Sequence, residues 1–309
     1  MNPFCRKALV LLWTAAVTST AWAQAWPAKP VRVVVAFTAG GTTDILARNV
    51  GQQLTEKLRQ PFIIDNKPGA GGNLGTEFVV RAPADGYTLI INSVGPIAVN
   101  PTLYPKLAYN PLADLVPIVQ IAEVPNVLVV HPSVPAKTFD EFVAYAKANP
   151  GMLNCSSTGI GTSSHLSCFI LAQRAGFEAV HVPYKGADAL RDLMAGRVQF
   201  MFATIPSVKQ LIDSGALRAI AVSSAKRSRS MPDVPTVAER GYPGFEAGSW
   251  FGFFGPKGTP AEVVATLNKA VNEIIAAPAT EAALIKEGAD PVGGTPQQFG
   301  QFVQREFEK

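Results

Sequence analysis

The sequence predicts an α/β protein whose two domains enclose a ligand-binding cleft, with the chain crossing twice between them. Along the first hundred residues, short β-branched runs alternate with helical segments, which is typical of a parallel sheet covered by helices. A unit of strand, glycine-rich turn and helix start occurs at 31–48 and again at 153–166. The length of 309 residues suits two domains of roughly 100 to 150 residues each.

The first 23 residues have the pattern of an export signal. Arg6 and Lys7 precede an apolar run, 8–17, that is too short to span a bilayer, and Ala21-Trp22-Ala23 fits a cleavage site. We therefore expect residues 1–23 to be a signal peptide and the mature protein to reside in the periplasm. Loss of Arg6 and Lys7 changes the formal net charge from +4 to +2, and a nearly neutral protein is a poor candidate for binding nucleic acid.

The first unit places a helix start directly after a glycine-rich turn. Val31 to Phe37 form a short apolar run that predicts a buried strand, and Gly40 and Gly41 follow it. Thr42 or Thr43 can cap the next helix. A helix N-terminus presents unpaired N–H groups and the positive end of the helix dipole, so this unit can bind an anion. An ordinary tight turn is the alternative interpretation.

Two further strands are expected in the first domain, at 61–65 and 87–93, with a glycine-rich helix start at 67–75 between them. That stretch fails the dinucleotide-binding fingerprint, because Leu74 stands where a glycine is required. We interpret it as a helix start that packs close to the first loop. Asn92 and Ser93 end the later strand, at the sheet edge where ligands bind in such folds.

The remaining elements divide between the two domains. We expect residues 24–129 and 248–309 to form the first domain and 130–247 the second, with hinge crossings near Val130 and Gly248. In the second domain, helices are expected at 138–149 and 187–195 and after the turn at 158–162, and strands at 127–130, 153–157, 180–183, 198–204 and 217–222. An aromatic strand at 249–256 returns the chain to the first domain, and helices from Pro260, Thr280 and Pro296 follow.

The sequence offers little for catalysis or metal binding. His131, His165 and His181 lack the spacing of metal ligands, and no nucleophile elbow of the type G-x-S-x-G is present. Ser163 or Ser164 near His165 resembles a nucleophile–base pair, but neighbours on one helix turn more simply cap and stabilise the helix. We therefore expect no enzymatic activity, no metal and no cofactor.

Two cysteines, Cys155 and Cys168, lie outside the signal peptide. The first falls in an expected strand and the second in the helix that follows it. An oxidising compartment permits a disulfide between them, and a pair of small buried thiols is the alternative interpretation.

Five short motifs occur in a fixed order along the mature chain. They are Gly-Gly-x-x-Asp-x-x-Ala-Arg at 40–48, Gly-Ala-Gly-Gly-Asn-x-Gly at 69–75, Asp-Gly-Tyr-Thr-Leu at 85–89, Gly-x-Gly-x-x-x-His-Leu at 159–166 and Val-Pro-Tyr-Lys-Gly at 182–186. In this order and spacing the chain resembles the periplasmic substrate-binding proteins of tripartite tricarboxylate transporters, the Bug family. The resemblance extends over about Trp26 to Phe307. It implies a type II periplasmic-binding-protein fold that holds an organic anion, usually a carboxylate, between the first loop and the loop at 159–165.

The candidate ligand-binding residues form two walls and one side of the predicted cleft. The first wall is expected to contain Phe37, Gly40, Gly41, Thr42 and Asp44, together with Asn92 and Ser93. The second wall is expected to contain Ser156, Thr158, Gly161, Thr162, Ser163 and His165. Tyr184, Lys185 and Ala203 are expected at the side. Lys185 is the one cation of these loops, and Asp44 is expected to order the loop, a water or backbone amides rather than touch the anion.

Two departures from the family pattern bear on the ligand. The family usually has Pro-Phe-Pro-Pro-Gly-Gly where this chain has Ala-Phe-Thr-Ala-Gly-Gly at 36–41, which frees the backbone and adds the hydroxyl of Thr38. The segment Phe202-Ala203-Thr204 stands where the family often has an acidic residue. Loss of that contact favours simple or aromatic carboxylates over amino acids.

The resemblance implies a monomeric receptor that closes on a small carboxylate and delivers it to a membrane permease. Two alternatives remain open at this point. A loaded receptor can instead present itself to a membrane histidine kinase, and the same scaffold can carry an exported hydrolase.

Overall fold

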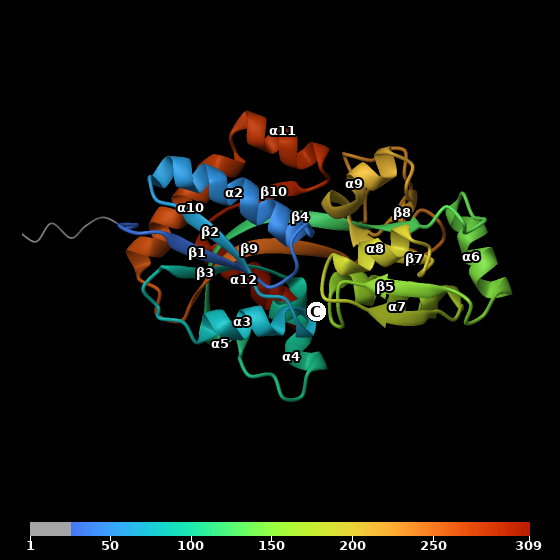
Figure 1. Ribbon diagram of the computed structural model, residues 1–309, viewed down its shortest axis with the longest axis horizontal. Coiled ribbons are helices and arrows are strands. Elements are labelled where there is room, and N and C mark those ends of the chain that lie inside the picture. Colours follow the sequence, from blue (N-terminus) through green and yellow to red (C-terminus); the bar gives the residue numbers. More distant parts are fainter. Residues whose placement is uncertain (1–25) are drawn as a thin grey trace, which may run out of the picture.

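Strand β4 (Leu115–Val130) runs through both halves of the molecule and joins them into one ten-stranded sheet. The structure, a computed structural model, describes residues 26–309, so the expected signal peptide lies outside the described residues. Figure 1 shows two α/β domains side by side, one containing the blue and red ends of the described chain and the other its green and gold middle. The predicted two-domain α/β fold is therefore confirmed.

The first domain is built on strands in the order β2-β1-β3-β9-β4-β10. Its elements are β1 (Val31–Val35), α2 (Thr42–Leu58), β2 (Phe62–Asn66), η1 (Ala70–Gly72), α3 (Asn73–Val80), β3 (Thr88–Ser93), η2 (Gly95–Val99), α4 (Asn100–Leu103), α5 (Pro111–Asp114), β9 (Gly248–Pro256), α10 (Ala261–Ile275), α11 (Pro278–Lys286), β10 (Asp290–Gly293) and α12 (Pro296–Glu308). Only β2, β1 and β3 pair in parallel; β9 pairs antiparallel with β3 and β4, and β10 antiparallel with β4.

Alternating side chains of β1 explain why helices cover both faces of this sheet. Val31, Val33 and Val35 pack into one buried cluster with α2 and α10, whereas Val34 packs into another with α3 and α12. Successive residues of a strand point to opposite faces, so an uninterrupted apolar run indicates a strand buried on both sides. This layering leaves the carboxyl ends of β1 and β3 free to face the second domain.

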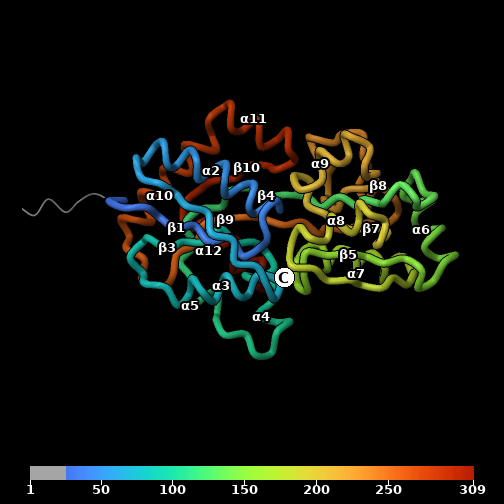
Figure 2. Tube along the Cα trace, in the orientation of Figure 1, coloured from blue at the N-terminus to red at the C-terminus, as the bar shows by residue number. Residues whose placement is uncertain are grey.

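The second domain has the strand order β8-β4-β7-β5-β6. Its elements are α6 (Phe139–Ala148), β5 (Asn154–Ser157), α7 (Ser163–Ala175), β6 (Val180–Pro183), α8 (Asp188–Met194), β7 (Phe200–Thr204), α9 (Ile205–Asp213) and β8 (Arg218–Val222). Phe200 and Phe202 of β7 pack with α6 and α7, and Met201 and Ala203 pack with α8 and α9. The tube view in Figure 2 shows the chain leaving the first domain through β4 and returning through β9.

The two crossings lie close together. From Leu115 to Pro125, β4 pairs with β9, and from Asn126 onward it pairs with β7 and β8. The Asn126 side chain donates to the Ala247 carbonyl at 3.2 Å, which links the two crossings. We propose domain boundaries at Pro125/Asn126 and Ala247/Gly248, so the first lies four residues before the one expected from the sequence.

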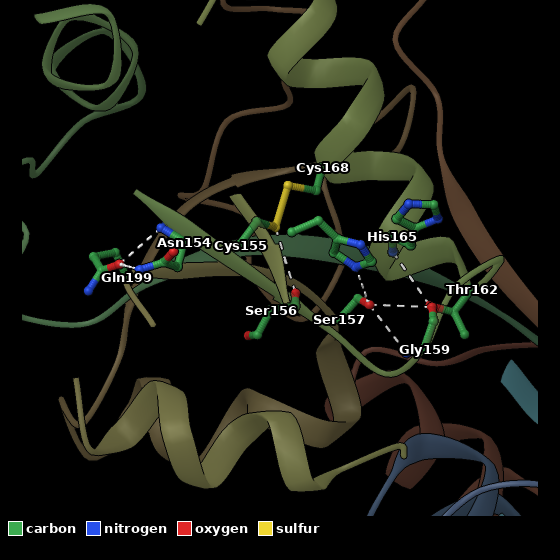
Figure 3. Close-up of a disulfide and its surroundings, with 10 residues drawn as sticks. Asn154, Cys155, Ser156, Ser157, Gly159, Thr162, His165, Cys168 and Gln199 are labelled. Atoms are coloured by element: carbon green, nitrogen blue, oxygen red, sulfur yellow. Dashed lines mark hydrogen bonds between the residues drawn. A yellow bond between two sulfur atoms is a disulfide. The ribbon is translucent and has the colours of Figure 1, made fainter. Parts of the chain in front are cut away.

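A disulfide joins Cys155 of β5 to Cys168 of α7 (Figure 3). Of the two interpretations that the sequence left open, the structure therefore has the bridge rather than two free thiols. Both side chains are buried in the core of the second domain. The bridge fixes α7 against the strand that precedes it, so it braces both ends of the loop at 158–162. Among residues 26–309, no helix has both the length and the apolar character required to cross a membrane.

Candidate functional site

A cavity of about 50 Å³ lies between the two domains, at the carboxyl ends of β1, β3 and β7. From the first domain it is lined by Phe37, Gly41, Thr42, Thr43, Ser93, Ser249 and Phe251. From the second domain it is lined by Thr158, Thr162, Ser163, Gly186, Ala187 and Thr204. Eight of these residues carry hydroxyl groups, and none of these lining residues carries a charged side chain. The wall therefore offers hydrogen bonds without a fixed charge.

Four helices begin at this cavity. The N-cap residues of α2, α7, α8 and α9 are Gly41, Thr162, Ala187 and Thr204, and all four line the wall. Only Thr162 uses its side chain to cap its own helix, by accepting from the His165 amide. Unpaired N–H groups and helix dipoles make such ends favourable places for negative charge. Because the four ends come from both domains, an anion here would be held from two sides.

Seven of the predicted site residues lie in the cavity wall: Phe37, Gly41, Thr42, Ser93, Thr158, Thr162 and Ser163. Six others in the wall were not predicted: Thr43, Gly186, Ala187, Thr204, Ser249 and Phe251. A signal for two of them existed, because Thr204 ends an expected strand and Ala187 starts an expected helix. Ser249 and Phe251 belong to β9, whose aromatic sequence indicates a buried strand but not which face meets the cleft.

Asp44 shapes the first loop from outside the cavity. Its carboxylate accepts hydrogen bonds from the Gly40 amide at 3.0 Å, from Arg48 Nε at 2.9 Å and from Asn66 Nδ2 at 3.0 Å. Burial by itself would raise the pKa of Asp44, but the hydrogen bonds from Arg48, Gly40 and Asn66 together lower it below its ordinary value. The carboxylate is therefore ionised at neutral pH and holds the loop in place.

Three predicted side-wall residues lie outside the cavity. The Tyr184 hydroxyl donates to Asp192 at 2.7 Å. Lys185 is exposed to solvent, and Ala203 is buried in the core with 1% of its surface exposed. Strand alternation explains why Ala203 is buried in the core: of the two neighbouring residues, Thr204 points toward the cleft.

Three more predicted residues, Asn92, Ser156 and Gly161, do not line the cavity. Asn92 donates to the Thr76 hydroxyl at 2.8 Å and accepts from the Ser93 amide. Ser156 is fully buried, and its hydroxyl has no hydrogen-bond partner among the described residues. Asn92 and Ser156 are fully buried, whereas Gly161 lies against Asn100 of the first domain.

The rings of His165 and His181 lie next to each other, with centroids 4.3 Å apart and planes tilted by 31°; Figure 3 shows His165 beside Gly159 and Thr162 of the loop at 158–162. The Gly161 amide donates to His165 Nδ1 at 3.3 Å, so that nitrogen carries no proton. Ser157 Oγ lies 2.7 Å from His181 Nε2 and also accepts from the Gly159 amide. The pair therefore supports the loop that carries Thr158 and Thr162, and His165 does not itself line the cavity.

We expect the free energy of unfolding to fall as the pH drops from about 6.5 to about 4, because the half-buried pair of His165 and His181 resists protonation. Burial, and then the neighbouring His165, lower the pKa of His181 to about 4. Between these pH values the unfolded chain binds a proton that the folded chain does not, so acid favours unfolding. The stabilisation is complete above pH 6.5. Since His181 is only half-buried, we expect a loss of about 1–2 kcal/mol.

Urea unfolding of the wild type and of His181→Gln at pH 7 and pH 4.5 measures this effect. Glutamine does not titrate and can still accept a hydrogen bond from Ser157. The variant should lose about 1–2 kcal/mol less than the wild type between the two pH values. Equal losses would show that His181 does not contribute.

A second, larger cavity of about 520 Å³ lies where β4 and β9 pass between the domains. Its charged residues are partly neutralised by ion pairs, with Arg229 Nε 2.8 Å from the Asp290 carboxylate. Arg227 likewise pairs with Glu239 at 2.9 Å. Because it lies away from the helix starts, we assign the candidate site to the smaller cavity.

Comparison with known proteins gives the same family from sequence and from structure. A family model described as the tripartite tricarboxylate transporter family receptor matches residues 46–309. The protein BugT of Bordetella pertussis is 37% identical over 302 residues, which cover 97% of this chain and 93% of BugT.

Two solved structures of similar proteins contain carboxylates. The structure of R. palustris Rpa4515 with adipate has a TM-score of 0.90 and 40% identity, and the match covers 92% of this chain and 95% of that one. The structure of MatC from Rhodopseudomonas palustris with bound malate has a TM-score of 0.87 and 35% identity, covering 92% and 98%. With a family match over most of its length and relatives above 30% identity, the chain belongs to the tripartite tricarboxylate transporter receptor family, the Bug family of periplasmic solute-binding proteins.

Proposed function

We propose that this protein is a periplasmic receptor that closes around one small organic carboxylate and delivers it to a tripartite tricarboxylate-type permease. The observation that carries the proposal is the convergence of the N-termini of α2, α7 and α9, which come from both domains, on one uncharged cavity. A carboxylate accepts several N–H and O–H donors at once, which is what this wall supplies. The carboxylates adipate and malate in structures of two relatives support the same class of ligand.

The neutral wall favours an acid without an amino group. An ammonium group needs an acidic or carbonyl partner when it is removed from water, and no acidic side chain lines the cavity within residues 26–309. Thr204 belongs to the segment 202–204, where the resemblance places an acidic residue in many family members, and it lines the cavity without a charge. We therefore propose simple dicarboxylates and aromatic monocarboxylates, rather than amino acids, as the ligand class.

Thermal-shift screening of the purified protein against mono-, di- and tricarboxylates, aromatic acids and amino acids tests this proposal. An acid at about 100 times its dissociation constant should stabilise the protein by roughly 2.7 kcal/mol, which raises the melting temperature by several degrees. We expect shifts with acids lacking an amine and none with amino acids or neutral sugars. A shift confined to amino acids or sugars would contradict the proposal.

Delivery to a permease, the monomeric state and export to the periplasm require separate measurements. Uptake of the identified acid by proteoliposomes containing the cognate permease should depend on added receptor. Uptake that proceeds unchanged without the receptor would contradict a transport role.

Light scattering should give the mass of one chain, and the N-terminus of the exported protein should be Gln24.

A further inference from the structure

The first loop makes a direct hydrogen bond to the second domain at a position outside the cavity. The Ala187 amide, at the start of α8, donates to Thr38 Oγ1 at 2.8 Å. Ala187 belongs to the cavity wall, but Thr38 does not. Thr38 therefore contacts a residue of the cavity wall without itself lining the cavity.

The Thr38 hydroxyl has no other hydrogen bond among the described residues, and this one crosses between domains. A hydroxyl that only ordered its own loop would instead bond within the first domain, as Asp44 does with Gly40. The contact exists only while the two domains are close together. The hydrogen bond therefore stabilises the closed arrangement of the two domains and is lost when the cleft opens.

The opposing surface fits Thr38 closely. Gly186 precedes Ala187, and a Cβ atom added there would lie 2.6 Å from Thr38 Oγ1 and 2.9 Å from the Thr38 nitrogen. The bare backbone of Gly186 thus allows the first loop to approach. In the cavity wall, Thr42 Oγ1 lies 2.7 Å from Thr204 Oγ1, which adds a second hydroxyl contact between the domains.

We propose that Thr38 is a latch residue, which holds the cleft closed through the Ala187 amide and thereby slows ligand release. The effect on ligand release rests on the proposed function, whereas the hydrogen bond between Thr38 and Ala187 does not. Removing one neutral hydrogen bond of this kind changes an equilibrium by roughly 2- to 10-fold. Because Thr38 does not line the cavity, the change should appear in the opening of the cleft and not in ligand selectivity.

The test compares the wild type with Thr38→Val, which keeps the shape but removes the hydroxyl, and with Thr38→Ser, which keeps the hydroxyl. Hydrogen exchange of the Ala187 amide is measured by NMR on the ligand-free proteins, and far-UV circular dichroism checks that each variant is folded. We expect slow exchange in the wild type and Thr38→Ser, and exchange roughly 3- to 10-fold faster in Thr38→Val. Equal exchange in all three proteins, or an unprotected amide in the wild type, would overturn the latch.

The second readout uses adipate as the probe. Stopped-flow measurements should show adipate leaving Thr38→Val roughly 3- to 10-fold faster than the wild type, with Thr38→Ser within about 2-fold and association rates unchanged. A uniform loss of affinity through slower association would contradict the latch. If adipate fails to bind even the wild type, the choice of adipate as ligand fails, while the exchange experiment still decides on the latch.

Discussion

Gly71→Ala is expected to weaken carboxylate binding at least 10-fold while leaving the protein folded. Gly71 lies in η1 of the first domain, and an added Cβ would be only 2.3 Å from the Ile160 carbonyl of the second domain. That distance is far below van der Waals contact, so the two backbones must move apart before an alanine fits. Gly71 does not line the cavity, and the loss should therefore come from a cleft that cannot close.

The control for this experiment must reproduce the backbone strain without the clash. Gly71 has φ +62°, a conformation that costs alanine about 1 kcal/mol. Gly151→Ala introduces the same side chain at φ +71°, where nothing lies within 4 Å. Both variants should lose about 1 kcal/mol of stability, but only Gly71→Ala should lose affinity in titration calorimetry. Wild-type affinity in Gly71→Ala would mean that the domains do not meet at this point in the liganded protein.

Thr204→Asp is expected to reduce affinity for simple carboxylates by at least 100-fold. The side chain of Thr204 lines the uncharged cavity and contacts Thr42. A carboxylate placed there would face the bound anion at close range, and two like charges about 4 Å apart repel by about 4 kcal/mol at the effective dielectric constant of a protein surface. The same carboxylate gives an ammonium group a partner, so binding of amino acids should appear.

Thr204→Asn provides the matched control, because asparagine has nearly the same shape as aspartate without its charge. Calorimetry at pH 7.5 with adipate, malate and a set of amino acids compares the two variants. The asparagine variant should keep its affinity for the acids to within about 10-fold. If both variants lose the same affinity for the acids, the cause is the shape of the new side chain and not its charge.

The sequence predicts most of the fold because its strands and helices are individually well marked. The alternation of β1, α2 and β2 follows directly from the apolar run at 31–37, the two glycines and the helical periodicity after them. Strand β4 is the main difference: only its last part, 127–130, was expected. Two irregularities in its pairing with β9, together with Pro117 and Pro125, hide the strand from a search for regular alternation.

The candidate site is predicted to the extent that it consists of helix starts. Thr42, Thr162 and Ser163 follow glycine-rich turns and were expected, and they line the cavity. Contacts between domains cannot be read from one sequence, because they depend on how the two halves approach. The meeting of Gly71 with Ile160 therefore becomes visible only in three dimensions.

Titration calorimetry with one acid and its primary amide tests the central claim most directly. The acid is the one that gives the largest melting shift, and its amide has nearly the same size without the negative charge. If the converging helix starts recognise an anion, the acid should bind at least 100-fold more tightly than the amide. Equal affinity for the two compounds would contradict a site built for a carboxylate.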